Sequence, residues 1–448
     1  MRKNKIMNRN NTKQRTGRGA SSHQTNTRTN QAPSRRRTSG SSYKNTRNGG
    51  QSGYRNTYQT YQPSRNQGTY NRRPANGRRR MEKKIDIQTF IEKASSTKPR
   101  KQHAIMHAFS DFGLCSDLEM NLKKRNYTMP TPIQDQAIKP IMEKNDIIGL
   151  ANTGTGKTAA FLLPIINKIY NNRSERVLII TPTRELAMQI DSEFRSFSEG
   201  MKIFSSVCIG GSPMQYQLRS LTRNPNVIIG TPGRLEDLAR RKYIDFKTCT
   251  TIVLDEVDRM LDMGFINTVQ AMLKETPADS QLLFFSATLP ESIEKLVHRF
   301  LKNPVTIQVQ TGQTTENVRQ DVVRVDNALG KFDMLIEILK RPEIEKVLIF
   351  SETKRDVEHL AVKLYKTGFK VDSIHGDKRQ RQRQRSLTMF RKNAINILVA
   401  TDVAARGLDI KDVTHVINYT IPQSFDDYIH RIGRTGRGTH KGTALTFV

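Results

Sequence analysis

Short apolar runs alternate with longer amphipathic stretches from about residue 105 to the end of the chain. In the first half, the runs that predict strands are 146–150, 176–181, 203–209, 227–230, 251–255 and 282–286. In the second half, they are 346–352, 370–376, 395–402, 414–419 and 443–448. Near-continuous apolar runs separated by helical stretches are typical of parallel sheets covered by helices on both faces. The pattern therefore predicts an α/β fold.

Breaks in this alternation divide the chain. Residues 311–328 lose the periodicity and predict a linker between one α/β domain at 105–310 and a second at 329–448. Residues 1–80 consist mainly of Asn, Arg, Gly, Ser, Thr and Gln, with five tyrosines and almost no aliphatic side chains. Because such a segment buries too little apolar surface to fold, we expect a disordered tail there. Residues 81–104 are expected to form a transition segment.

The net charge of +32 is concentrated in this tail. It holds 20 Lys or Arg and no acidic residue, which leaves 54 basic and 42 acidic residues in the rest of the chain. Arginines neutralise phosphates and tyrosines stack on exposed bases, so the tail is expected to bind nucleic acid without sequence preference. A solubilising tail with no specific partner and an organellar transit peptide are the alternatives.

The composition argues against a membrane or secreted protein. No run of about 18 apolar residues is present, and the N-terminus lacks the apolar core of a signal peptide. The three cysteines, Cys115, Cys208 and Cys249, lack metal-ligand spacing, and an odd number suits no disulfide framework. A reducing, cytoplasmic setting is expected.

The segment ANTGTGKT follows a predicted strand and precedes a predicted helix. A loop in this place, here residues 151–158, is called a P-loop. It turns its backbone N–H groups toward phosphate oxygens at a helix N-terminus. Lys157 is expected to reach the outer phosphates, and Thr158 to offer its hydroxyl to Mg²⁺. The residues of this loop expected to bind ATP are Ala151, Asn152, Thr153, Gly154, Thr155, Gly156, Lys157 and Thr158.

A cluster of carboxylates, VLDEVD, ends the predicted strand 251–255. Carboxylates packed against a buried strand are costly unless something compensates them, and a P-loop fold holds Mg²⁺ there, usually through water. Asp255 is expected to take this role. Glu256 faces differently, because strand side chains alternate, and is expected to polarise a water for attack on the γ-phosphate.

A second catalytic element is expected in YIHRIGRTGR, residues 428–437. Its arginines recur at three-residue intervals with glycines between them, which indicates a shaped turn that brings guanidinium groups to one point. Such arginine fingers stabilise the negative charge of a phosphoryl-transfer transition state. Because this turn lies in the second domain and the P-loop in the first, catalysis would require domain closure.

From about Phe109 to the end, these motifs and their order resemble the DEAD-box ATP-dependent RNA helicases of superfamily 2, most closely the bacterial RhlE-type branch. The resemblance implies two tandem RecA-like domains with parallel sheets, ATP and Mg²⁺ as cofactors, and RNA as partner. It implies an ATP hydrolase in which RNA-stimulated hydrolysis drives local, non-processive duplex unwinding or remodelling of RNA–protein complexes. The RNA target, the pathway and any protein partner are not specified.

The resemblance also assigns roles around ATP. NYTMPTPIQ, residues 126–134, is similar to the Q motif, in which Gln134 reads the adenine edge and Tyr127 stacks on the ring. Phe109 matches the isolated upstream aromatic, and Asp409 is implied to hold the ribose. Arg434 and Arg437 are implied to be the fingers. The residues expected to couple the ATP site to domain closure are Ser286, Ala287, Thr288, Asp258 and His430.

The resemblance assigns RNA contacts to Pro182, Thr183, Arg184, Gly210, Gly211, Thr231, Gly233, Arg234, Thr353, Gln380, Arg383 and Thr401. These are hydroxyls, loop backbone and arginines, which suit phosphates and 2′-hydroxyls rather than base edges. Binding with little sequence specificity is therefore expected.

Three positions depart from the family pattern. Asn126 replaces the usual glycine, and asparagine tolerates a left-handed backbone. Val257 stands where the family has alanine, but both functional acids remain, so we expect activity with some repacking nearby. The chain stops at Val448, where family members usually continue into a helix, which predicts a trimmed or fragmentary chain with a less stable second domain.

Two other functions remain as alternatives. A non-enzymatic RNA clamp or scaffold would bind RNA without stimulated ATP turnover, and intact Lys157, Glu256 and fingers argue against it. A DNA translocase of a related branch is disfavoured by the Q motif and by contacts that suit 2′-hydroxyls.

Overall fold

The computed structural model describes residues 87–95, 104–152, 154–309, 317–325, 330–405, 410, 412–436 and 441–448. The predicted tail, residues 1–80, lies outside these ranges. Thr153, Asp409 and Arg437, to which the sequence assigns roles, also lie outside them. Within the described ranges, no helix is both long enough and apolar enough to cross a membrane.

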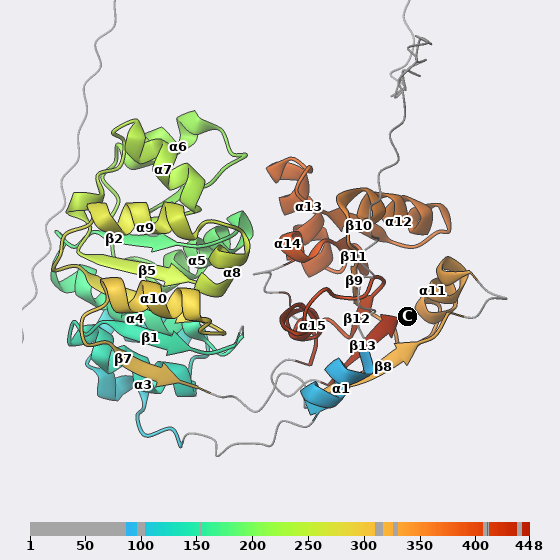
Figure 1. The fold of residues 1–448 in the computed structure, drawn as a ribbon. Coiled ribbons are helices and arrows are strands. Elements are labelled where there is room, and N and C mark those ends of the chain that lie inside the picture. The colour runs from blue at the N-terminus through green and yellow to red at the C-terminus, as the bar shows by residue number, and fades with distance from the viewer. Residues whose placement is uncertain are drawn as a thin grey trace, which may run out of the picture. The chain divides into compact units, whose positions relative to one another are not determined.

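The first domain is built on a seven-stranded parallel sheet in the order β3-β4-β2-β5-β6-β1-β7 (Figure 1). Its strands are β1 Ile147–Leu150, β2 Val177–Ile180, β3 Ser205–Cys208, β4 Val227–Gly230, β5 Thr251–Asp255, β6 Gln281–Ser286 and β7 Val305–Gln308. The helices are η1 Phe109–Phe112, α2 Ser116–Lys124, α3 Pro132–Met142, α4 Lys157–Asn171, α5 Arg184–Phe197, α6 Met214–Leu221, α7 Pro232–Arg240, η2 Phe246–Thr248, α8 Val257–Asp262, α9 Ile266–Glu275 and α10 Glu291–Phe300.

Alternate residues of each central strand enter different cores. In β2, for example, Ile179 joins the core formed with α2 to α5, whereas Leu178 and Ile180 join the core formed with α7 to α10. Both faces of the sheet are therefore covered, which is why its strands read as continuous apolar runs.

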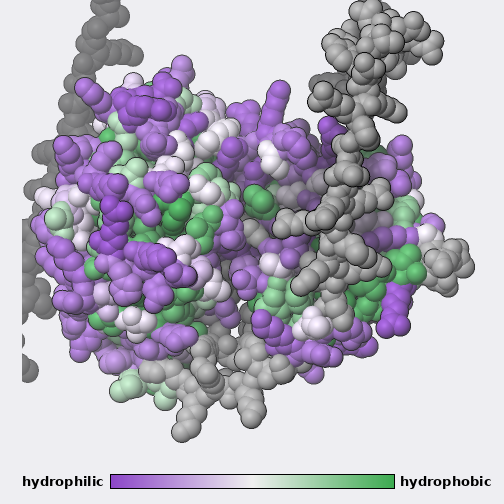
Figure 2. Space-filling view, in the orientation of Figure 1, coloured by the Kyte–Doolittle hydropathy of each residue, from purple (hydrophilic) through white to green (hydrophobic). Residues whose placement is uncertain are grey.

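The second domain repeats this plan with a six-stranded parallel sheet in the order β10-β11-β9-β12-β13-β8. Its strands are β8 Val318–Val323, β9 Val347–Phe350, β10 Val371–Ile374, β11 Ile397–Ala400, β12 His415–Asn418 and β13 Gly442–Phe447. Its helices are α11 Lys331–Leu339, α12 Lys354–Lys366, α13 Gln380–Arg391, α14 Asp402–Ala405 and α15 Phe425–Ile432. Hydrophilic side chains cover most of the coloured surface in Figure 2, with hydrophobic ones interspersed.

The predicted fold of two parallel-sheet α/β domains is confirmed, and each predicted apolar run contains a strand. Two further strands, β7 and β8, were not predicted. β8 lies inside the range expected to be a linker, and it pairs with β13 over its whole length. Both are edge strands whose side chains are mostly exposed or half-buried, so neither contains the continuous apolar run of a central strand.

The expected transition segment also contains a helix, α1 Ile87–Ser95, which packs on the second domain (Figure 1). Ile87 and Ala94 are buried in a cluster with Tyr428 and Ile432 of α15. The ring of Phe90 lies edge-on to that of Phe425, with 5.7 Å between centroids. A segment that precedes the first domain in sequence thus belongs structurally to the second.

Candidate functional site

The P-loop connects β1 to α4. Gly154 and Gly156 have φ angles of 85° and 95°, and a Cβ added at Gly156 would lie 2.5 Å from the Nε2 atom of Gln134. Glycine is therefore required at position 156 by both conformation and space. The Nζ atom of Lys157 donates to the carbonyl oxygen of Ala151 at 2.8 Å, which places this lysine over the loop that the sequence predicts to hold phosphates.

The Q motif is joined directly to this loop. The Oε1 atom of Gln134 accepts from the backbone N–H of Thr131 at 2.9 Å, and its Nε2 atom donates to the carbonyl of Gly156 at 3.1 Å. The rings of Phe109 and Tyr127, both predicted to bind ATP, lie beside each other with centroids 6.2 Å apart. Asn126 has a φ of 57°, so the left-handed backbone expected at this position is present.

Asp255 and Glu256 lie at the carboxyl end of β5, the central strand of the first sheet, and both are buried. Burial raises the pKa of Asp255 to about 7, although Lys157 acts in the opposite direction. Its Oδ1 atom has no hydrogen-bond partner among the described residues. Glu256 has a φ of 56°, a conformation that a residue with a Cβ adopts only where its surroundings hold it there.

The donors available here fit Mg²⁺. This ion keeps several waters and takes only one or two carboxylates from the protein, the rest of its shell coming from phosphates. Among the described residues, no group of three or more His, Cys, Asp or Glu side chains could enclose a metal. The uncompensated oxygen of Asp255 and the hydroxyl of Thr158 at the start of α4 therefore suit an ion held mostly by water and nucleotide.

Asp258 connects the acidic segment to SAT, residues 286–288. Its Oδ2 atom accepts from the backbone N–H groups of Ala287 at 3.0 Å and Thr288 at 3.1 Å, and from the Thr288 hydroxyl at 3.3 Å. The backbone N–H of Asp258 donates to the Oγ atom of Ser286 at 3.3 Å. The structure thus brings together four of the five residues predicted to couple the ATP site to domain closure.

Arg259 is a site residue that the sequence reasoning did not single out. Its side chain is almost fully buried, and its Nε atom lies 3.3 Å from the Oε2 atom of Glu256. The signal in the sequence was a basic residue one helical turn after Glu256, in a short helix that also contains Asp258 and Asp262. Val257, between Glu256 and Asp258, is fully buried in the core that α8 shares with β5 and β6, so its two methyl groups are packed.

Predicted RNA contacts of the first domain lie around the carboxyl ends of β2, β3 and β4. The guanidinium of Arg184 covers Gly210 and Gly211, and a Cβ at Gly211 would lie 2.3 Å from its Nη1 atom. Glycine is therefore needed for this close approach. A pocket in this region is lined, among others, by Pro182, Thr183, Arg184, Gly210, Thr231, Gly233 and Arg234.

Predicted RNA contacts of the second domain lie at helix N-termini. Thr353 is the N-cap of α12, and the hydroxyl of Thr401 accepts from the backbone N–H of Ala404 at 3.4 Å. Gln380 and Arg383 begin α13, and both donate to the carboxylate of Glu185, at 3.1 and 2.7 Å. These two side chains are therefore engaged with protein in the structure.

Arg431 near the end of α15 and Arg434 just after this helix differ in their surroundings. Arg431 forms a two-pronged pair with Asp402, through contacts of 2.6 and 2.7 Å, and donates to the carbonyl of Thr420, so it holds the domain together. Arg434, a predicted finger, is buried, and its Nε atom donates to the carbonyl of His430 at 3.2 Å. The backbone of His430, a predicted coupling residue, thus orients Arg434.

Comparison with known proteins extends this picture. Residues 131–296 match the family of DEAD/DEAH box helicases, and residues 330–439 match the helicase conserved C-terminal domain. The ATP-dependent RNA helicase CshA of Limosilactobacillus reuteri is 43% identical over 342 residues, which cover 76% of this chain and 69% of that protein. The DEAD-box ATP-dependent RNA helicase CshA of Bacillus subtilis is 42% identical over 343 residues, covering 76% and 69%.

Solved structures show the same relationship. Dbp5 of S. cerevisiae bound to RNA and ADP BeF3 is 32% identical, with a TM-score of 0.69 over 77% of this chain and 90% of that one. Mss116p bound to ssRNA and AMP-PNP is 29% identical, with a TM-score of 0.70 over 78% and 76%. The relatives are of the CshA type, so they do not support the expected RhlE-type branch. Both halves of the molecule, in sequence and in structure, place the chain in the DEAD-box family of ATP-dependent RNA helicases.

Proposed function

We propose that the chain hydrolyses ATP at the junction of the P-loop with β5, and that RNA stimulates this hydrolysis. The observation that carries the proposal is the buried Asp255 carboxylate, close enough to Lys157 for the lysine to affect its pKa, yet without a hydrogen-bond partner for Oδ1 among the described residues. A buried carboxylate in this condition is stabilised by a cation, and the cation of a P-loop site is Mg²⁺.

Each residue then has a defined task. Lys157 leaves the Ala151 carbonyl for the outer phosphates, and Glu256 takes up the proton of the attacking water. When bound, Mg²⁺ neutralises charge on the phosphates and is held by Thr158 and Asp255. Arg434 and Arg437 stabilise the charge that develops in the transition state.

The adenosine is proposed to lie against the Q motif, with Gln134 reading the adenine edge, Tyr127 and Phe109 packing on the ring, and Asp409 holding the ribose. The loop that binds phosphates contributes Ala151, Asn152, Thr153, Gly154, Thr155 and Gly156. The Gln134 contact to the Gly156 carbonyl supports this arrangement, because it connects base recognition to the phosphate loop.

RNA is proposed to bind through its backbone, with little sequence specificity, at the residues assigned above in both domains. Dbp5 and Mss116p were solved with RNA and a nucleotide analogue, which supports the same pair of ligands here. Nucleotide and RNA favour a closed arrangement only through their greater affinity for it. Asp258, bonded to SAT, would pass this preference to the acids, and the result is local, non-processive duplex unwinding or remodelling of RNA–protein complexes.

Three finer points complete the proposal. The branch is CshA-like, as the relatives indicate. Residues 1–80 add non-specific RNA binding through their arginines. The sequence predicts a cytoplasmic location for the chain, and we propose the same here.

One assay tests the proposal: the rate of ATP hydrolysis without nucleic acid, with RNA and with DNA, for the wild type and for Glu256→Gln. We expect stimulation by RNA and not by DNA. The substitution should lower the stimulated rate by about 10²- to 10⁴-fold while RNA binding persists.

The same assay separates the alternatives. An RNA clamp would bind RNA with no stimulated turnover in the wild type, and a translocase would respond to DNA. Equal rates with and without RNA would contradict the proposal.

A further inference from the structure

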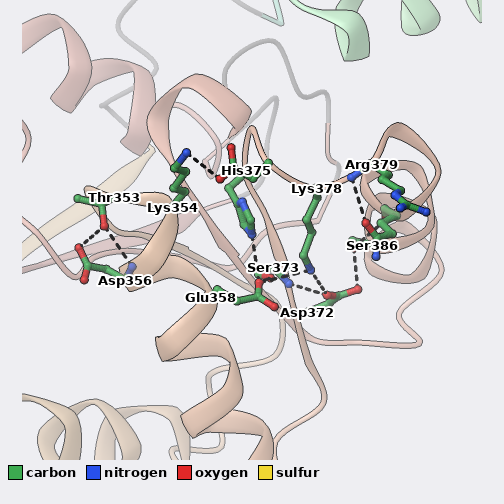
Figure 3. A network of polar contacts seen from close by, with 12 residues as sticks. Thr353, Lys354, Asp356, Glu358, Asp372, Ser373, His375, Lys378, Arg379 and Ser386 are labelled. Atoms are coloured by element: carbon green, nitrogen blue, oxygen red, sulfur yellow. Dashed lines mark hydrogen bonds and ion pairs between the residues drawn. The ribbon is translucent and has the colours of Figure 1, made fainter. Parts of the chain in front are cut away.

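The loop between β10 and α13 is held by a carboxylate that the sequence analysis did not single out (Figure 3). Asp372 accepts three hydrogen bonds, from the backbone N–H of Ser373 at 2.7 Å, the Nζ atom of Lys378 at 2.9 Å and the Oγ atom of Ser386 at 2.6 Å. Ser386 lies two turns into α13 and Lys378 lies in the loop. One side chain therefore fixes strand, loop and helix to one another.

A second carboxylate extends this network to α12. Glu358 accepts from the hydroxyl of Ser373 at 2.5 Å and lies 3.1 Å from the Nε2 atom of His375 and 3.8 Å from the Nζ atom of Lys378. Lys378 therefore lies between Glu358 and Asp372. The loop is held from both sides (Figure 3).

The first turn of α12 is joined to the same loop. The Nζ atom of Lys354 lies 2.7 Å from the Oδ2 atom of Asp377. Its neighbour Thr353 caps the helix by accepting from the backbone N–H of Asp356, and donates to the Asp356 carboxylate at 2.6 Å. The N-termini of α12 and α13 are thus connected through residues 375–379. These termini carry Thr353, Gln380 and Arg383, and helix N-termini favour phosphate groups.

The charges here would be unfavourable next to RNA if they were not paired. Burial alone would raise the pKa of Asp372, but hydrogen bonds from Ser386 and Lys378 outweigh it and hold the pKa below its usual range. The pKa of Glu358 is likewise lowered, because bonds from Ser373 and His375 outweigh burial. Both carboxylates are therefore ionised at neutral pH and committed to their protein partners.

We infer that Asp372, together with Ser386, is a positioning residue for RNA binding: it fixes the loop at residues 375–379 and so sets the spacing of the two helix N-termini that contact the RNA backbone. This inference rests on the proposed function for the RNA contacts of Thr353, Gln380 and Arg383. It adds residues that touch no RNA themselves and act through the loop.

The sign of the effect distinguishes positioning from simple electrostatics. Asp372→Asn removes a negative charge close to the proposed RNA path, which would by itself strengthen the binding of a polyanion. Positioning predicts the reverse, because the bonds to Lys378 and Ser386 weaken. Binding of a fluorescent single-stranded RNA to the full chain is measured by anisotropy, with and without Mg²⁺ and AMP-PNP. The nucleotide-dependent part of the affinity separates this site from the tail.

We expect Asp372→Asn to weaken the nucleotide-dependent affinity about fivefold, and Ser386→Ala, which changes no charge, about twofold. Glu345→Gln is the matched control: it removes one exposed acid that precedes the amino end of β9, away from the carboxyl ends of the strands where the loop lies, and should leave RNA affinity unchanged. Turnover without RNA should be unaffected in all three variants.

Unchanged or tighter RNA binding by Asp372→Asn with wild-type binding by Ser386→Ala would overturn the inference. A rise in affinity in both Asp372→Asn and Glu345→Gln would do so as well, since it would show a charge effect alone. Because binding is the readout, a wild type that binds RNA but hydrolyses no ATP would contradict the proposed function and leave this comparison intact. A wild type that binds no RNA would overturn both.

Discussion

Asp255 and Asp372 are both aspartates of parallel sheets, one in each domain, yet their surroundings shift their pKa values in opposite directions. Asp255 is fully buried in the first domain with an uncompensated oxygen, and its pKa rises to about 7. Asp372 is half-buried in the second domain with three donors around it, and its pKa is lowered. The first carboxylate is destabilised in the fold and available to a cation, whereas the second stabilises the fold and is not available.

The largest expected effect is on ATP turnover, and it distinguishes Asp255 from Asp372. Asp255→Asn should lower RNA-stimulated ATP turnover by about 10³-fold, because the site loses the carboxylate that holds Mg²⁺. Asp372→Asn should leave turnover at saturating RNA close to that of the wild type. Steady-state ATPase measurements at saturating ATP and RNA check both, and equal losses in the two variants would remove the distinction.

The second effect is on folding stability: the substitution of Asp255 that lowers activity should stabilise the folded chain. Because folding raises the pKa of Asp255 from 3.8 to about 7, the folded chain binds the proton more tightly, and stability falls as pH rises through this window. Asp255→Asn should therefore increase the free energy of unfolding by about 2 to 4 kcal/mol at pH 8 and by little at pH 4. Denaturant unfolding without nucleotide, at both pH values, tests this, and a less stable variant at pH 8 would refute it.

The third effect concerns α1, which belongs to the second domain although it precedes the first. Phe90→Ala should destabilise the second domain by about 2 kcal/mol, because it removes a half-buried ring that packs on Phe425 and Tyr428. Amide hydrogen exchange should accelerate in α15 and not in α4. Glu92→Ala, at an exposed position of the same helix, is the control and should change neither.

The smallest expected effect is the loss of the stability that Asp372 contributes to the second domain. Asp372→Asn should lower the free energy of unfolding by about 1 kcal/mol at pH 7, a modest value because the group is half-exposed to solvent. Since folding lowers the pKa of Asp372, its contribution is present above the unfolded pKa and is lost as pH falls through the folded value. Thermal unfolding from pH 7 to pH 3 should show the difference from the wild type disappear. A difference that grows on acidification would contradict this assignment.

What the sequence could predict follows from how local each signal is. A central strand such as β5 is buried on both faces, so its apolar run can be recognised from its own residues. The P-loop and VLDEVD are likewise recognisable from a few consecutive residues. β8 and α1 are defined by partners far away in the chain, Phe447 and Tyr428 among them, and their own residues alternate or are mixed. Local periodicity carries no information about such partners.

Prediction of the site residues is limited in the same way, because some of them depend on partners that are distant in the sequence. Asp255 and Glu256 were predictable because a strand end and a P-loop imply each other in this fold class. Asp372 acts through neighbours that are close in space and further away in the sequence. The pairing of Asp372 with Ser386 crosses 14 positions, and its ion pair with Lys378 forms only because the loop turns back on β10. Charged residues in such places look like ordinary solvated positions until the backbone is known.

Burial raises the pKa of Asp255, so Mg²⁺ and ATP are expected to displace a proton from this carboxyl when they bind. Binding of Mg²⁺·ATP at neutral pH should therefore release protons, because a bound cation favours the ionised carboxylate. Calorimetric titration with Mg²⁺·ATP, in buffers of different ionisation enthalpy, measures this release. The wild type should release more protons than Asp255→Asn, and an equal release in both would show that the Asp255 carboxyl loses no proton when the ion binds.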